Sequence, residues 1–191
     1  MNNKWQRIYH YRQLPHAEKA RKIAMLIQLG KIPYIGRQFL NQIPKYFING
    51  KNVIVIRGFY CIYGNIDAEN VDLCDAFCID YGLIKIGKNT SFSFQVMILT
   101  SNHDLEDFCK VIVEPVIIGE NVRIESRVII LKGVTIGDNT VIGAGSVVAE
   151  DIPSGVLAAG VPCKVIRQID RGKIEWWEND KENLDKLGQS I

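Results

Sequence analysis

Aliphatic residues recur at every sixth position through the second half of the chain. The leading place of six consecutive hexads, all in one phase, is taken by Ile118, Ile124, Ile130, Ile136, Ile142 and Val148. The fifth place is taken by Val122, Val128, Val134, Thr140, Ser146 and Ile152. A period of six fits neither an α-helix nor a simple hairpin meander. It predicts a β-helix in which three hexads form one triangular coil and the leading side chains stack along the axis.

The sequence also contains residues that we expect at the corners of the predicted coils. We expect the small residues in the fifth place to let the chain turn, and the glycines after leading aliphatic residues to allow backbone angles that a Cβ atom would disfavour. Those glycines are Gly87, Gly119, Gly137 and Gly143. Ile86, Phe92 and Ile98 continue the rhythm upstream. The fold class is therefore mainly β, with a solenoid predicted over residues 51–169.

The two flanking segments carry different patterns. Residues 16–30, HAEKARKIAMLIQLG, follow Pro15 and place an apolar stripe from Ala20 to Ile27 that ends at Gly30, which predicts a helix. A solenoid has open ends that need covering. We therefore expect residues 1–50 to form a helical N-terminal cap and residues 170–191 a short C-terminal extension.

The six-residue rhythm breaks once. Ile98 and Ile118 lie twenty residues apart, so the chain must leave the coil and return with its phase shifted by two. This predicts a loop excursion at about residues 103–116, and such insertions often line the binding face of a repeat protein. His103, the only histidine of the repeat region, lies where this excursion begins. It is either a structural residue or a base, because an imidazole can take a proton from a hydroxyl near neutral pH.

Composition narrows the class of protein. The chain has 23 basic and 21 acidic residues and a net charge of +2, which favours neither nucleic acid nor an anionic membrane as a partner. No apolar stretch reaches the length of a signal peptide or a membrane span, so we expect a cytoplasmic protein without an integral membrane segment. The five cysteines form no CxxC pair and are interpreted as buried apolar filler.

Three stretches of the sequence resemble a known protein family. The stretches SNHD, VIVEPVIIGENVRI and VTIGDNTVIGAGSVVAEDIPSGVLAAGVPCKVIRQI resemble the left-handed β-helix O-acetyltransferases of the galactoside and maltose group, most of all the colanic-acid type enzymes of polysaccharide pathways. The resemblance covers about residues 51–169. It implies left-handed coils, a homotrimer, and acetyl-CoA bound in the groove between adjacent solenoids. It further implies that a sugar or polysaccharide-precursor hydroxyl attacks the thioester directly in a ternary complex, with His103 as general base.

The resemblance also assigns residues to the cofactor. Ser126 matches a position whose backbone N–H faces the thioester oxygen, an oxyanion-hole role. Ala144 and Gly160 match positions beside the pantetheine and adenine ends of acetyl-CoA. Lys164 and Arg167 would meet its phosphates, the alternative being that both are solvated residues at the rim of the solenoid.

Substrate contacts follow from the same resemblance, with departures. The acceptor-side Asn of the family falls on Asp80, and Asn102 beside the histidine is a second predicted substrate contact. Arg123 and Glu125 stand where relatives carry Trp and Gly, which alters the wall near the thioester. Glu150, preceded by Ala149, stands where many relatives have Thr-Lys, which removes one expected phosphate partner.

Three other functions remain open from the sequence. The acetyl group could go to the nitrogen of an amino-sugar nucleotide, since a His base serves an amine as well as a hydroxyl. The solenoid could be a non-catalytic scaffold, in which case Arg123 and Glu125 would indicate a groove that no longer binds the cofactor. A γ-type carbonic anhydrase would need three imidazoles around zinc, whereas the predicted coils contain only His103, so we expect no metal.

Overall fold

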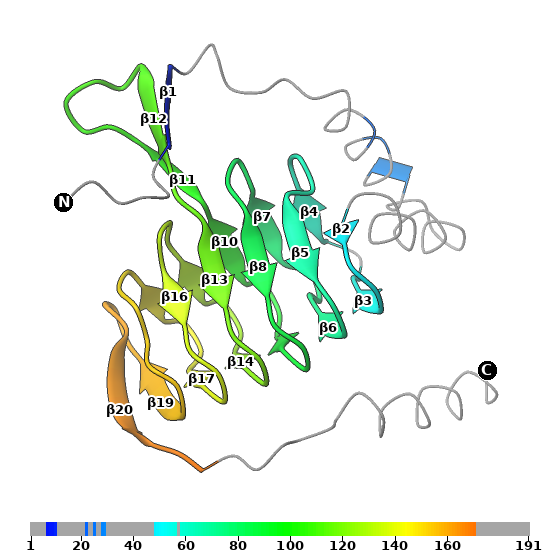
Figure 1. The fold of residues 1–191 in the computed structure, drawn as a ribbon, viewed down its shortest axis with the longest axis vertical. Helices are drawn as coiled ribbons and strands as arrows, with labels where there is room; N and C mark the ends of the chain where they lie inside the picture. Colours follow the sequence, from blue (N-terminus) through cyan, green and yellow to red (C-terminus); the bar gives the residue numbers. More distant parts are fainter. Residues whose placement is uncertain are drawn as a thin grey trace.

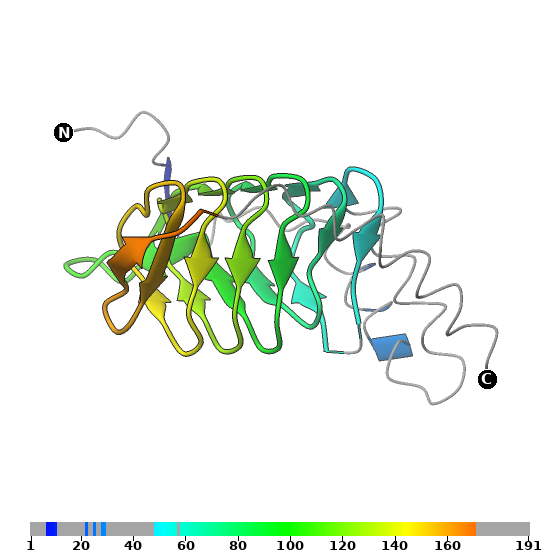
Figure 2. The ribbon, with the colours of Figure 1, turned by 90° about the horizontal axis from the view of Figure 1, so that it is seen from below.

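The computed structural model describes residues 7–10, 22, 25, 28–29, 48–56 and 58–170. Most of this part of the chain winds into a left-handed parallel β-helix of about six coils (Figures 1 and 2). Three parallel sheets form its faces. We call the edges between them the first corner (first to second face), the second corner (second to third face) and the third corner (third to first face).

Each face is a ladder of short strands. The first face contains β2 (Ile48–Asn49), β5 (Ile66–Ala68), β8 (Ile84–Ile86), β13 (Val116–Ile118) and β16 (Thr135–Ile136). The second contains β3 (Val53–Ile54), β6 (Val71–Asp72), β9 (Ser91–Phe92), β14 (Arg123–Ile124), β17 (Val141–Ile142), β19 (Val156–Ala159) and β20 (Lys164–Gln168). The third contains β4 (Tyr60–Cys61), β7 (Phe77–Ile79), β10 (Met97–Leu99), β15 (Ile129–Ile130) and β18 (Val147–Val148).

The predicted hexad repeat is confirmed in the core. Ile118 pairs with Ile136 and Ile124 with Ile142, so equivalent residues of neighbouring coils lie eighteen positions apart. The leading side chains are at most 1% exposed, and the fifth-place side chains at most 5%. Both places therefore point inward. Each fully buried aliphatic side chain contributes roughly 1.5–3 kcal/mol before entropy is subtracted.

The turn lies at the fourth place, and the prediction that the fifth place turns the chain was wrong. Residues there adopt a positive φ, as at Asn121 (φ 55°), Arg127 (60°), Gly133 (78°), Asn139 (56°) and Gly145 (72°). This left-handed region suits Gly and Asn, whereas other residues adopt it at a cost.

The predicted reason for the second-place glycines was also wrong. Gly87 and Gly119 do not have a positive φ. A Cβ atom on Gly87 would instead lie 2.6 Å from the backbone of the next coil, at Gly119 and Glu120. Glycine is needed there because neighbouring coils approach too closely for any side chain.

The excursion lies at the third corner and is a β-hairpin rather than a loop. It consists of β11 (Ser101–His103) and β12 (Lys110–Val113), and antiparallel pairing joins Ser101 to Val113. An unpredicted strand, β1 (Arg7–His10), adds to the outer edge of β12 (Figure 1). Thr100 holds the base of the hairpin, because its buried hydroxyl donates to the Ile79 carbonyl and accepts from the Gly82 N–H.

Both ends of the solenoid differ in detail from the prediction. The first coil starts with Ile48 rather than near Lys51, since β2 pairs with β5. At the other end β20 folds back antiparallel on β19 and forms the edge of the second face. Four residues of the predicted cap helix are helical, namely Lys22, Met25, Gln28 and Leu29. The rest of that helix, and the C-terminal extension beyond Asp170, lie outside the described residues.

The cysteines follow the expectation with one exception. Cys61, Cys74, Cys78 and Cys163 are buried and form no disulfide bond, whereas Cys109 is exposed in the hairpin. Burial raises the pKa of the Cys78 thiol well above its usual value and that of Cys74 to about 11. These buried thiols are poor nucleophiles.

Candidate functional site

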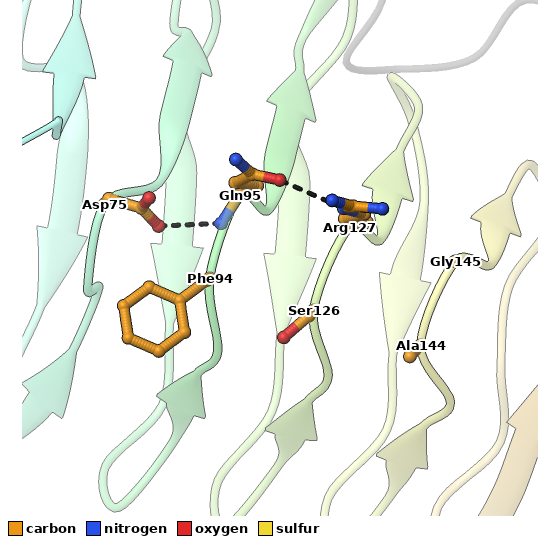
Figure 3. A pocket seen from close by; sticks show the side chains of 7 residues that line it. All are labelled: Asp75, Phe94, Gln95, Ser126, Arg127, Ala144 and Gly145. Atoms are coloured by element: carbon orange, nitrogen blue, oxygen red, sulfur yellow. Dashed lines mark hydrogen bonds between the residues drawn. The ribbon is translucent and has the colours of Figure 1, made fainter.

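A groove of about 670 Å³ runs along the second corner (Figure 3). Its floor is a row of residues in the third place of successive coils. Ladder pairing of Phe92, Ile124, Ile142 and Ala158 places the residue two positions after each of them in register, so the row contains Phe94, Ser126, Ala144 and Gly160. The first three line the groove, and Gly160 continues the row beyond it. Three residues predicted to contact the cofactor therefore lie in one line, separated by roughly 4.8 Å per coil. The side chains shrink along this line from Phe94 to Gly160.

The wall of the groove beside this row is polar. The backbone N–H of Gln95 donates to the Asp75 carboxylate (2.7 Å), and Arg127 Nε donates to the side-chain Oε1 of Gln95 (3.0 Å), so Gln95 links Asp75 to Arg127 beside the row (Figure 3). Asp75, Phe94, Gln95 and Arg127 were not predicted as site residues. Their signal was available in the sequence, since FSFQ and IESR replace the IGKN, IGEN and IGDN pattern of the first corner.

The predicted base lies on a different corner of the same protomer. His103 ends β11 in the hairpin at the third corner and is exposed. Its Nδ1 lies 2.8 Å from the Phe108 carbonyl oxygen, which can only accept, so Nδ1 carries a proton. In the neutral ring Nε2 therefore holds the lone pair. The predicted substrate contact Asn102 is exposed one residue away.

Asp80 has a different environment from the one expected. Its carboxylate is fully buried and accepts hydrogen bonds from the backbone N–H groups of Ile62, Tyr63 and Asn65. It therefore holds the turn between the third and first faces. A direct contact between Asp80 and a sugar stays a prediction that the geometry of the single chain does not support.

The outer surface of the third face is apolar along its whole length. The outward side chains of its strands are Tyr60, Phe77, Ile79, Met97, Leu99, Ile129 and Val147. Tyr60 and Phe77 stack with ring centroids 4.8 Å apart. On the first face, by contrast, Asp67, Lys85 and Thr135 point outward. The apolar face lies between the groove at the second corner and His103 at the third.

In the part of the chain that the structure describes, no three His, Cys, Asp or Glu side chains come together as a possible metal site. No helix within it is long and apolar enough to cross a membrane.

Comparison with known proteins gives consistent matches. Residues 115–150 match the family model "Bacterial transferase hexapeptide (six repeats)". A galactoside O-acetyltransferase of Escherichia coli (strain K12) is 41% identical over 140 residues, which cover 72% of this chain and 65% of the relative. The crystal structure of a maltose O-acetyltransferase from Clostridium difficile 630 has a TM-score of 0.70 at 35% identity, covering 81% of this chain and 88% of that chain. A galactoside acetyltransferase in complex with coenzyme A has a TM-score of 0.69 at 32% identity, covering 80% and 82%.

The chain belongs to the hexapeptide-repeat family of galactoside and maltose O-acetyltransferases. The family resemblance in the sequence is thereby confirmed. The chain spans just under two thirds of the length of the Escherichia coli relative.

Within this acetyltransferase fold, the three charged residues expected to depart from the family pattern each form an ion pair. Arg123 Nε lies 3.1 Å from the Glu125 carboxylate and its terminal nitrogen donates to Ser91 Oγ, on the outer side of the second face rather than along the groove. Lys164 Nζ lies 2.7 Å from the Glu150 carboxylate, with both side chains more than half exposed. Lys164 is therefore paired with a carboxylate on the exposed surface.

The last predicted cofactor contact, Arg167, lies on β20 opposite Leu157 and is exposed. Its terminal nitrogen makes a long contact of 3.4 Å to the Gln168 carbonyl. Arg167 and Lys164 thus both lie on the antiparallel edge strand that follows Gly160, at the small-residue end of the row.

Proposed function

We propose that the protein is an acetyl-CoA-dependent O-acetyltransferase that acts on a sugar or polysaccharide-precursor hydroxyl. The observation that carries the proposal is the row of Ser126, Ala144 and Gly160, which starts in the groove and ends beside two basic residues. This row suits a long, thin cofactor with a charged end. A relative with this fold has been solved with coenzyme A in place.

The donor is proposed to lie along the row. Its pantetheine arm passes over Ala144 and Gly160, where the absence of large side chains lets the arm approach the backbone. Its phosphates meet Lys164 and Arg167. The thioester then lies at Ser126, whose backbone N–H would stabilise the negative charge that develops on the carbonyl oxygen.

The base is proposed to be His103. With Nδ1 holding a proton against the Phe108 carbonyl, Nε2 accepts the proton of the acceptor hydroxyl as its oxygen attacks the thioester carbon. The C–O bond forms, the C–S bond then breaks, and the imidazolium returns the proton to the leaving thiolate. No covalent acyl-enzyme is formed, so donor and acceptor must be bound together.

The catalytic site is proposed to form between protomers of a homotrimer. The apolar third face has to be covered, and a three-fold arrangement of identical chains would cover it in each protomer. The groove and His103 flank this face on opposite edges. Packing the faces together therefore brings the groove of one protomer toward His103 of the next.

A complementation experiment tests both the chemistry and the sharing. His103→Ala removes the base and Ala144→Trp fills the groove, so each variant alone should transfer acetyl from acetyl-CoA to a nitrophenyl galactoside or maltose at less than about 1% of the wild-type rate. Mixed trimers, prepared by co-expression, contain interfaces in which an intact groove faces an intact His103. We expect these to recover a substantial part of the activity.

Two results would contradict the proposal. Full activity of His103→Ala would remove the histidine from the reaction. Failure of the mixed trimers to recover activity, with both variants trimeric by light scattering, would place the whole site within one protomer.

A further inference from the structure

The first and second corners both contain a residue with a positive φ in each coil, but the residue types at these positions differ between the two corners. At the first corner five left-handed positions are asparagines, at Asn52, Asn70, Asn89, Asn121 and Asn139, with φ between 53° and 57°, and the last coil has Gly155 (φ 69°) there. At the second corner the left-handed positions are Cys74 (φ 49°), Gln95 (60°), Arg127 (60°) and Gly145 (72°). Asn and Gly enter this region readily, whereas Gln and Arg do so at a cost of about 1–2 kcal/mol each.

This contrast points to function at Gln95 and Arg127. Both positions lie in the groove, and both would be more stable as Asn, the residue found at the equivalent turn of the first corner. Backbone strain that persists at a cavity is a sign that the side chains are required there. In the groove, Gln95 Oε1 accepts from Arg127 Nε at 3.0 Å, which restrains the guanidinium and leaves its terminal N–H groups outside this bond.

Phe94 adds a second unusual feature to the same place. Its ring is 58% exposed and lies in the row beside Ser126, one coil from the proposed thioester position. An exposed aromatic face flanked by a carboxylate (Asp75), an amide (Gln95) and a guanidinium (Arg127) combines an apolar platform with hydrogen-bond acceptors and donors. A saccharide ring has the complementary chemistry, with apolar C–H faces and a rim of hydroxyls.

We propose that Phe94, Arg127 and Asp75 form the acceptor subsite, and that it takes an uncharged pyranose. The sugar ring lies on the face of Phe94, one hydroxyl accepts from Arg127, and another donates to Asp75. The opposite charges of Asp75 and Arg127 favour a ligand that both donates and accepts over an anionic sugar. The inference rests on the proposed function, which it deepens by naming residues for the acceptor.

The test uses variants that separate function from folding. Arg127→Asn should raise the KM for a nitrophenyl galactoside or maltose by about tenfold or more, because a charged hydrogen bond is lost. The KM for acetyl-CoA should change by less than about twofold, which separates acceptor binding from donor binding. The melting temperature should stay the same or rise, since the strain at residue 127 is relieved. Phe94→Leu should likewise raise the acceptor KM, and Phe94→Tyr should preserve it.

A control variant places the same residue at the other corner. Asn139→Arg introduces strain at the first corner, away from the groove, so it should lower the melting temperature and leave both KM values unchanged. A structural role for Arg127 would give the opposite result, with Arg127→Asn less stable and both KM values unaffected.

Binding of the same two sugars, measured by saturation-transfer NMR without acetyl-CoA, distinguishes this proposal from the one on which it rests. Sugar binding that is lost in Arg127→Asn and Phe94→Leu supports the subsite even if no transfer occurs, in which case only the proposed function fails. Three results overturn the subsite: no binding of either sugar to the wild type, unchanged acceptor binding in both variants, or a Phe94→Leu variant that accepts butyryl-CoA with an unchanged acceptor KM. The last result would mean that Phe94 limits the acyl chain.

Discussion

Removing one hydroxyl at the base of the hairpin should separate the positioning of His103 from general stability. In Thr100→Val the Gly82 N–H loses its acceptor, which lies 2.8 Å away, and the Ile79 carbonyl loses a donor at 2.7 Å. Thr90→Val is a matched control at the first corner. Its equally buried hydroxyl donates to the Gly119 carbonyl (2.8 Å) and accepts from the Val122 N–H (3.0 Å).

The magnitudes follow from these bonds. Each substitution keeps the volume of the side chain and removes two hydrogen bonds worth about 1 kcal/mol each. Both variants should therefore lose about 2 kcal/mol of unfolding free energy, or roughly 4–8 °C in melting temperature. Only Thr100 lies under the hairpin, so only Thr100→Val should displace His103. A shift of this kind can reduce the rate by about tenfold or more.

The assay is transfer from acetyl-CoA at a temperature well below both melting points, with kcat compared against thermal unfolding for the two variants. Equal kcat values for Thr90→Val and Thr100→Val, at similar stability losses, would refute the reasoning. Either the hairpin would then be held without Thr100, or His103 would not be the base.

Three further predictions use other parts of the solenoid. Glu150→Ala should lower the KM for acetyl-CoA by about threefold at low salt, because Lys164 then meets the cofactor phosphate without a competing carboxylate, and the gain should vanish at high salt. Gly119→Ala should cost about 1–3 kcal/mol in a denaturant titration, because the new Cβ atom would lie 2.8 Å from the backbone nitrogen of Asp138. In a thiol titration at pH 8 the native protein should react at Cys109 alone, and the four buried cysteines should react only on unfolding.

The six-residue spacing predicted the fold because it marks the side chains that point inward. Burial of these side chains supplies most of the stabilising free energy of a solenoid. Ile118 to Val148 could be assigned to the core without knowing how coils stack. The turn residues were misassigned for a related reason. Whether Gly87 is needed for its backbone angle or for its lack of a Cβ atom depends on the neighbouring coil, which a single hexad does not contain. The pairing of β1 with β12 joins segments about a hundred residues apart, and the short RIYH stretch carries no signal for it.

The alignment of the small residues in one row could be predicted from the sequence, whereas the polar wall beside them was not predicted, and the contact of the row with a cofactor stays a prediction. Ser126, Ala144 and Gly160 follow from family motifs and from the eighteen-residue coil. The buried environment of Asp80 was not predicted, because an acidic residue after a strand has the same sequence appearance whether it faces a ligand or accepts backbone N–H groups. Burial decides between these two roles, and burial of a polar side chain is set by the turn around it.

The first corner of the repeat stabilises the solenoid, whereas the second corner presents side chains to the groove. Each coil has a residue of positive φ at its first and second corners, so the identity of that residue is the variable that selection can change without altering the coil. At the first corner, Asn side chains hydrogen-bond from coil to coil, as Asn52 does to Asn70 and Asn121 to Asn139, both at 2.8 Å. At the second corner the same backbone position carries Gln95 and Arg127, which are less favourable for the turn but face the groove. The binding chemistry is thus placed on a backbone that the remaining hexads hold in position, and its strain is offset by a core of stacked aliphatic residues.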